Sequence, residues 1–274
     1  MLMRRLMLFF TITLMLIQGV NSGRAAIKEV YPILDLKSVN AGCLMGAVQD
    51  GKLLAAEAAK ALLKGGERYR IYGLTGLTGE ATGKKPASVG EPCVDTFEVV
   101  LSPAPTGSGA IAIAGSWNAL PRTPKLTSTT DAVYREAIGE ILKQKGITNP
   151  KINLTQVIRI DLEGDGVEEV LINATNFRAG QLDANSQAGD YSLVLLRKLV
   201  EGKVVTVPIN EEYHIKAGEF DAPNEYSVVA VLDVDGDGVM EIAVHSRYYE
   251  GEATILYRIE GTKTRELLSC GCGA

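Results

Sequence analysis

The sequence predicts an α+β protein with a small mixed N-terminal unit and a larger β-rich C-terminal unit. Three observations support this class. Strong helix formers are concentrated at residues 52–63, and a Pro- and Gly-rich stretch interrupts the chain at 102–109. From residue 156 onward, β-branched and aliphatic runs alternate with turns. We expect the C-terminal unit to contain two four-stranded antiparallel repeats and one packed helix.

The N-terminus is typical of an exported protein. Arg4 and Arg5 precede an apolar run at residues 6–17, and small and polar residues follow. This is the order of a secretory signal peptide, and the run is shorter than the ~20 apolar residues that span a bilayer. We therefore expect residues 1–25 to be a signal peptide, with a cut before Gly23 as the alternative. The protein is then secreted or held in the cell envelope, with no membrane span after cleavage.

The net charge limits the choice of partner. The full chain carries −5, and loss of residues 1–22 removes two arginines and no acid, which leaves −7. A net negative surface argues against a nucleic acid partner. We expect calcium and an unknown extracellular protein or glycan instead.

Four cysteines in an exported chain predict disulfides. The favoured pair is Cys43 with Cys93, because both belong to the N-terminal part. Cys270 and Cys272 are separated only by a glycine. They could form a strained disulfide with each other, pair with other cysteines, or have a redox or metal role.

The N-terminal unit is predicted to be a small α+β domain at residues 26–101. A helix at 52–63 is ended by the glycines that follow it, and strands are expected at 69–74 and 96–101. Residues 102–109 are predicted to form a linker, because proline, glycine and serine dominate them.

The β-rich domain is predicted at residues 110–274. Thr130 is placed to cap a helix at 131–145, in which Tyr134 and Ile138 lie on one face with Ile141 and Leu142. That face is expected to pack on a sheet. The remainder reads as two copies of one pattern, at 157–207 and 228–268: a strand, an acidic loop, a second strand and a hairpin.

The acidic loops are the most informative feature of the chain. They lie 72 residues apart, and both have acids at positions one, three, five and nine and a glycine at position six. Such carboxylates repel one another unless a cation lies among them, and Ca²⁺ takes six to eight oxygen ligands. We expect two independent Ca²⁺ sites, with a main-chain carbonyl at position seven. The predicted ligands are Asp161, Glu163, Asp165, Val167 and Glu169 in the first loop, and Asp233, Asp235, Asp237, Val239 and Glu241 in the second.

The simpler alternative is that Asp-Gly forms a hairpin turn in each copy. That explains the Gly-Asp-Gly centre of each loop. It does not explain acids at four matching positions in two places. An EF-hand is excluded because it needs Glu at position twelve, where this chain has Ile172 and Val244.

The loop pattern resembles the Asp-x-Asp-x-Asp-Gly-x-x-Asp/Glu loops of FG-GAP and VCBS-type repeats, as in calcium-binding β-propeller blades. The resemblance covers roughly residues 157–176 and 228–247. It implies blade-like repeats in which the acids bind calcium. The chain departs from the family in two ways: the Phe-Gly and Gly-Ala-Pro elements are missing, and Glu163 replaces a shorter acid. Two copies are also too few to close a propeller.

The predicted function is an exported, non-catalytic calcium-binding module, with adhesion or ligand binding as its role. Calcium is expected to stabilise the strand–loop–strand repeats. The alternative is a secreted calcium-dependent hydrolase, which would need an open coordination position at the metal. The sequence contains no Gly-x-Ser-x-Gly nucleophile motif and no His-Glu-x-x-His motif. Whether the protein is an enzyme stays open, with the non-catalytic interpretation preferred.

Overall fold

The computed structural model describes residues 29–39, 41–177 and 183–273. The predicted signal peptide, residues 1–25, lies entirely outside these residues. Among the described helices, none has the length and apolar character needed to cross a bilayer.

The fold is β-rich, and the predicted α+β class is wrong. In the described ranges only α1 (Ala56–Leu62) and α2 (Ala132–Gln144) are α-helices. The helix predicted at 52–63 is shorter than expected, because its first residues form β3 (Lys52–Ala55) and pair with β2. Helix propensity is a weak preference, and hydrogen bonding to an adjacent strand overrides it here.

Nine strands form the N-terminal sheet, in the order β6-β7-β2-β1-β9-β4-β5-β8, with β3 paired to β2. The other bounds are β1 Val30–Asp35, β2 Gly42–Gln49, β4 Arg68–Gly73, β5 Gly76–Gly83, β6 Ala87–Ser88, β7 Phe97–Val99, β8 Leu101–Ser102 and β9 Ile111–Ile113. Residues 102–109, predicted as a linker, run from the end of β8 toward β9. Because β9 pairs with both β1 and β4, this stretch connects two strands of one sheet.

The first acidic loop belongs to a five-stranded antiparallel sheet, which we call the first-loop sheet. Its order follows the chain: β10 (Lys125–Leu126), β11 (Leu154–Ile160), β12 (Glu169–Thr175), β13 (Tyr191–Val200) and β14 (Lys203–Tyr213). The short strand β10 adds one strand to the four predicted for this repeat.

The second acidic loop belongs to a four-stranded antiparallel sheet, the second-loop sheet. It consists of β15 (Glu225–Leu232), β16 (Glu241–Tyr248), β17 (Gly251–Glu260) and β18 (Lys263–Gly273). In both sheets the acidic loop joins two neighbouring strands, and a hairpin follows, in the order that the sequence predicts.

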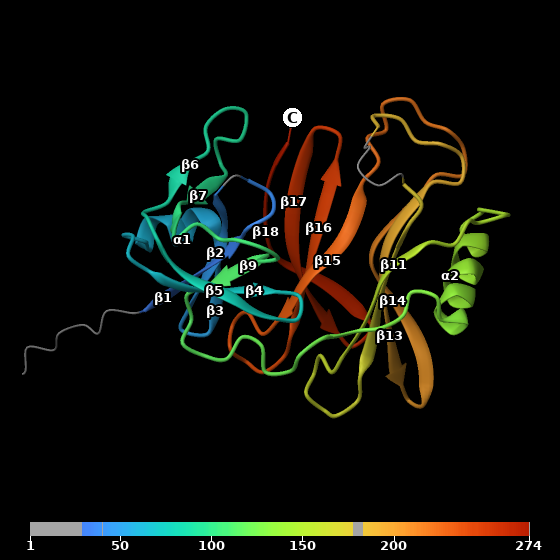
Figure 1. Ribbon diagram of the computed structural model, residues 1–274, viewed down its shortest axis with the longest axis horizontal. Helices are drawn as coiled ribbons and strands as arrows, with labels where there is room; N and C mark the ends of the chain where they lie inside the picture. Colours follow the sequence, from blue (N-terminus) through green and yellow to red (C-terminus); the bar gives the residue numbers. More distant parts are fainter. Residues whose placement is uncertain (1–28, 40, 178–182, 274) are drawn as a thin grey trace, which may run out of the picture.

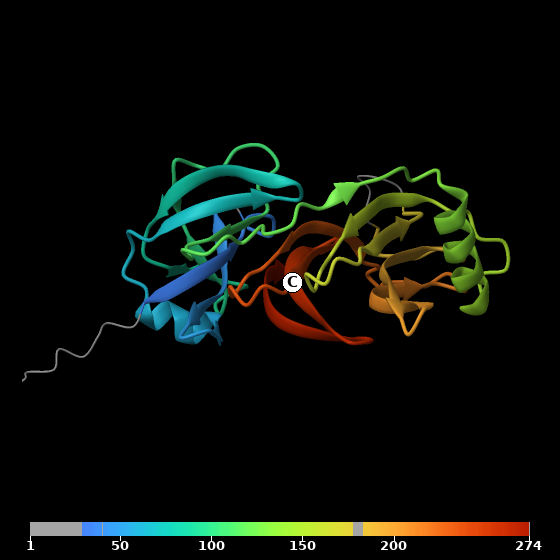
Figure 2. The ribbon, with the colours of Figure 1, turned by 90° about the horizontal axis from the view of Figure 1, so that it is seen from below.

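The four layers lie in a row: α2, the first-loop sheet, the second-loop sheet and the N-terminal sheet (Figures 1 and 2). Alternation of side chains along the strands supplies the contacts. On β12, Leu171 packs toward the second-loop sheet and Ile172 toward α2. On β16, Ile242 packs toward the first-loop sheet and Ala243 toward the N-terminal sheet. The two loop-bearing sheets are therefore stacked face to face, and a different element covers each end of the stack.

Helix α2 matches the helix predicted at 131–145. Asp131, rather than Thr130, is the N-cap: its side chain accepts a hydrogen bond of 3.0 Å from the backbone N–H of Val133. Ile138 and Leu142 are buried against the first-loop sheet. This buried face fixes the helix over one side of the sheet.

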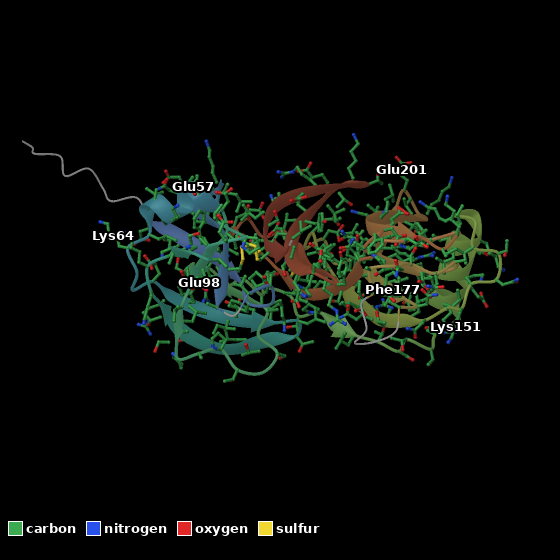
Figure 3. The ribbon with its side chains drawn as sticks, turned by 90° about the horizontal axis from the view of Figure 1, so that it is seen from above. Glu57, Lys64, Glu98, Lys151, Phe177 and Glu201 are labelled. Carbon is green, nitrogen blue, oxygen red and sulfur yellow. A yellow bond between two sulfur atoms is a disulfide. The ribbon has the colours of Figure 1, made fainter. Side chains whose placement is uncertain are left out.

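Both disulfides connect the N-terminal unit to the last strand, and the favoured Cys43–Cys93 pairing is wrong. The bonds join Cys43 to Cys270 and Cys93 to Cys272. Alternate residues of a strand point to the same side. The two cysteines of β18 therefore face the same neighbour and reach two different partners there. Figure 3 shows the sulfur atoms in yellow where the N-terminal sheet meets the second-loop sheet.

Candidate cation site

The first residue of each acidic loop accepts hydrogen bonds from the loop's own backbone. In the first loop, Asp161 Oδ1 lies 2.6 Å from the N of Gly164 and 3.2 Å from that of Asp165, and Oδ2 lies 3.0 Å from the N of Gly166. In the second loop, Asp233 makes the corresponding contacts at 2.6, 3.1 and 3.0 Å. The two loops therefore share one backbone conformation.

Positions five and nine repeat this correspondence. The carboxylates of Asp165 and Asp237 each accept a 2.8 Å bond from the backbone N–H of position seven, which is Val167 or Val239. Glu169 and Glu241 each accept a 2.9 Å bond from the N–H of position two. The acids at one, five and nine thus shape the loop through hydrogen bonds to its own backbone.

The second loop brings three predicted ligands together. One carboxylate oxygen each from Asp233, Asp235 and Asp237 lies within 4.8 Å of the others. Asp233 is buried, Asp235 half-buried and Asp237 exposed. No other group of three or more possible metal ligands lies this close together within the described part of the chain, so the first loop does not form one there. Oxygen ligands of this kind suit a hard cation such as Ca²⁺.

Arg258 of β17 already provides a positive charge to the second loop. Its Nη2 lies 3.0 Å from Asp235 Oδ2 and 2.5 Å from Glu241 Oε1, and its Nη1 lies 2.9 Å from Asp237 Oδ2. A guanidinium with several donors in a fixed plane is well suited to bridge carboxylates. The donor atoms therefore fit a cation, but a metal would have to displace at least part of this contact.

Lys198 of β13 has a related role in the first loop. Its Nζ forms a short ion pair with Glu163, the acid at position three. Neither basic residue is predicted from the sequence. The strand register indicates them, because each lies on the strand that pairs with the strand following its loop.

Burial changes the protonation of the acids at these loops. It raises the pKa of Glu241 to about 7, although the Val234 N–H and Arg258 act in the opposite direction. Burial also raises the pKa of Glu169 to about 7, and it raises that of Asp233. Burial acts to lower the pKa of Arg258, but Glu241, Asp235 and Asp237 outweigh it and raise the pKa. The Arg258 guanidinium therefore stays charged, and the second loop always has this positive side chain beside its carboxylates.

A crossing segment, residues 114–124, runs from the N-terminal sheet to the first-loop sheet (green in Figure 1). It contacts both acidic loops. Its Trp117 donates from Nε1 to the Asp233 carbonyl at 2.8 Å, and the Asp233 N–H donates to Ala119 at 2.9 Å. Arg122 bonds carbonyls of both loops. These residues lie in an irregular stretch, and nothing in its pattern indicates their contacts.

An acidic cleft lies at the opposite end of the second-loop sheet. Two hollows of about 410 and 480 Å³ share Tyr248, Glu252 and Cys272 in their walls. Their other acidic and aromatic residues are Asp95, Glu98, Tyr249 and Glu250. Glu241 and Tyr248 are the first and last residues of β16. The rise of a strand therefore separates the acidic loop from the cleft by roughly 23 Å.

Comparison of the chain with protein-family models, with curated proteins and with solved structures found no match.

Proposed function

We propose that the protein is an exported, non-catalytic module that binds Ca²⁺ in its two acidic loops, and that Ca²⁺ stabilises the stacked sheets. The observation that carries the proposal is the convergence of Asp233, Asp235 and Asp237. On this proposal the loops are of the FG-GAP and VCBS type, and the stack is an open pair of blades.

Export is supported by the N-terminal sequence and by the disulfides. Two disulfides link segments 227 and 179 residues apart. Such bonds persist mainly in oxidising compartments. The proposed location is therefore the extracellular space or the cell envelope.

A structural role for Ca²⁺ is favoured over a catalytic one by the position of the cleft. A calcium-dependent hydrolase needs substrate beside the metal. The cleft at Tyr248 lies at the far end of β16 from the second loop. Metal and substrate would therefore be too far apart for the metal to polarise a bond in a ligand held in that cleft.

The cleft is the proposed contact surface for a partner. Its acidic residues favour a positively charged protein segment, and its tyrosines offer apolar contact area. The proposed test is binding of a lysine- and arginine-rich peptide to the wild-type protein and to Glu250→Gln/Tyr249→Ala. Equal binding by both would argue against this surface.

The calcium proposal is tested by titration of the metal-free protein with CaCl₂, followed by calorimetry and by the thermal midpoint. The variant Asp235→Asn/Asp237→Asn removes two charges from the second loop and keeps side-chain oxygens there. We expect it to lose binding at that loop. Glu260→Gln is the matched control, because Glu260 is an exposed acid that pairs only with Arg265 among the ion pairs of the described residues. Absence of heat and of any thermal shift in the wild type would refute the proposal.

A further inference from the structure

One side chain, that of Arg122, forms hydrogen bonds with both acidic loops. Arg122 of the crossing segment donates from Nε to the Asp161 carbonyl at 2.5 Å and from Nη2 to the Leu162 carbonyl at 2.9 Å. The same Nη2 donates to the Gly238 carbonyl at 2.8 Å. One guanidinium therefore holds positions one and two of the first loop and position six of the second.

A backbone hydrogen bond reinforces this bridge. The N–H of Met240 donates to the Leu162 carbonyl at 2.9 Å, so that carbonyl accepts from both Arg122 and the second loop. The side chains of Leu162 and Met240 are both buried in the core between the two loop-bearing sheets. A change in the backbone of either loop near these residues must therefore be accommodated by the other.

We propose that Arg122 makes the two loops one cooperative cation-binding unit, in which a cation bound in one loop raises the affinity of the other. The proposal rests on the proposed function. Its physical basis is ordering: a cation that fixes one loop also fixes the carbonyls shared through Arg122, so the second cation has less backbone to order. Arg122 is a positioning residue, since it holds carbonyls and not the cation. The sequence alone treats the loops as separate and predicts independent sites.

The chain has a built-in reporter for the second loop. Trp117 is its only tryptophan. The indole Nε1 bonds to the Asp233 carbonyl, and its ring atoms lie 3.1 Å from the point where a Cβ on Gly236 would be. Tryptophan fluorescence during a titration with CaCl₂ therefore follows the second loop, while calorimetry follows both loops.

The test is a double-mutant cycle on the midpoint of this fluorescence titration. Asp165→Asn removes a ligand charge from the first loop and keeps the oxygen that accepts from Val167. In the wild type, we expect this change to raise the Ca²⁺ concentration at the midpoint about tenfold, within the usual range of couplings between sites. The Arg122→Lys background keeps the positive charge but loses the planar set of donors. There we expect Asp165→Asn to raise the midpoint by less than about twofold. Charge effects through space act in both backgrounds and cancel in the comparison.

Arg159→Lys is the matched control, because Arg159 binds Glu168 of the first loop at 2.9 Å and, within the described part of the chain, forms no hydrogen bond or ion pair with the second loop. In the Arg159→Lys background, Asp165→Asn should still raise the Ca²⁺ concentration at the midpoint about tenfold, as in the wild type. If Ca²⁺ binds but Asp165→Asn shifts the midpoint equally with Arg122 and with Lys at that position, coupling through Arg122 is refuted and the proposed function stands. If no Ca²⁺ binds by calorimetry, both are refuted.

Should the Arg122→Lys protein fail to fold, hydrogen exchange of the Asp165→Asn variant, in which Arg122 is kept, replaces the cycle. Occupancy of the second loop in Asp165→Asn should then slow exchange of the backbone amides in both loops. Protection confined to residues 233–241 would overturn the proposal.

Discussion

Lys198 and Arg258 occupy equivalent positions beside the two acidic loops. Val170 pairs with Arg197 in the first-loop sheet, and Ile242 pairs with Tyr257 in the second. The next residue along β13 or β17 is the basic one, opposite the glutamate at position nine. Each loop therefore receives a cation from its own sheet, and an added metal ion competes with that side chain.

Removal of Arg258 should make the second loop depend on calcium. Arg258→Gln leaves Glu241, which is fully buried, without its charged partner. We expect a loss of about 3–5 kcal/mol in the free energy of unfolding in EDTA well above pH 7, where Glu241 is charged, because an unpaired buried charge is costly. Added Ca²⁺ should recover part of this loss, as measured by denaturant unfolding with and without the metal.

Arg265→Gln is the control for that change. Arg265 and Glu260 are both about half exposed, so their ion pair should contribute less than about 1 kcal/mol. If Ca²⁺ stabilises Arg258→Gln no more than it stabilises the wild type, the metal does not take the place of the guanidinium.

The contact between Trp117 and the second loop can be measured with two glycine substitutions. Gly236 and Gly238 both have positive φ, 81° and 89°. Alanine at either site should cost roughly 1–2 kcal/mol for backbone strain. Only Gly236→Ala adds a tight contact, because its Cβ would lie 3.1 Å from Trp117, whereas no described atom lies within 4 Å of a Cβ at Gly238. We expect the larger destabilisation, and a change in tryptophan fluorescence, for Gly236→Ala. Equal effects on both measurements would mean that the contact contributes nothing.

Each disulfide should contribute to stability, because each closes a long segment of chain. We expect Cys43→Ser/Cys270→Ser and Cys93→Ser/Cys272→Ser each to lower the free energy of unfolding by about 2–5 kcal/mol. Peptide mapping without reductant checks the linkages first. Recovery of a peptide that joins Cys43 to Cys93 would contradict the structure.

His245 lies in a polar cluster between the N-terminal sheet and the second-loop sheet. Its Nδ1 is 3.1 Å from Thr254 Oγ1, and its Nε2 is 3.3 Å from Glu252 Oε2. The Thr254 hydroxyl donates to the fully buried Asp35 at 2.9 Å. Burial lowers the pKa of His245 below 6.5, although Asp35 and Glu252 act to raise it.

This shift predicts a pH dependence of stability. Between the folded pKa of His245 and 6.5, the unfolded chain binds more protons at this site than the folded protein does. The stabilisation is therefore complete above 6.5 and is lost as the pH falls through the folded pKa. We expect the free-energy difference between wild type and His245→Gln to shrink as the pH is lowered below 6.5. Denaturant unfolding over roughly pH 5 to 7 measures it.

The free energies of unfolding of the two proteins are subtracted because other groups titrate in the same pH range. Glu169 and Glu241, with pKa values raised to about 7, make stability fall as the pH rises from 4.5, and this slope is present in both proteins. A difference that stays constant over the whole range would show that His245 has no part in the pH dependence.

The elements around the acidic loops could be predicted from the sequence because they depend on local patterns. Acids at fixed positions, a glycine where φ is positive, and flanking aliphatic runs depend only on neighbouring residues. That is why β11 and β12, β15 and β16, and helix α2 lie close to where the sequence predicts them. The hydrogen bonds that shape each loop are also local, since they join residues two to seven positions apart.

Tertiary structure alone decided the features that join distant segments. The pairing of Cys43 with Cys270 depends on β18 lying against the N-terminal unit. Pairing with β2 converted the start of a helix-forming stretch into a strand. The charges of Lys198 and Arg258 reach the loops only because of strand register, and Arg122 reaches both loops only because the sheets stack. Composition and periodicity describe neighbours along the chain, whereas these contacts depend on which surfaces meet when the chain is compact.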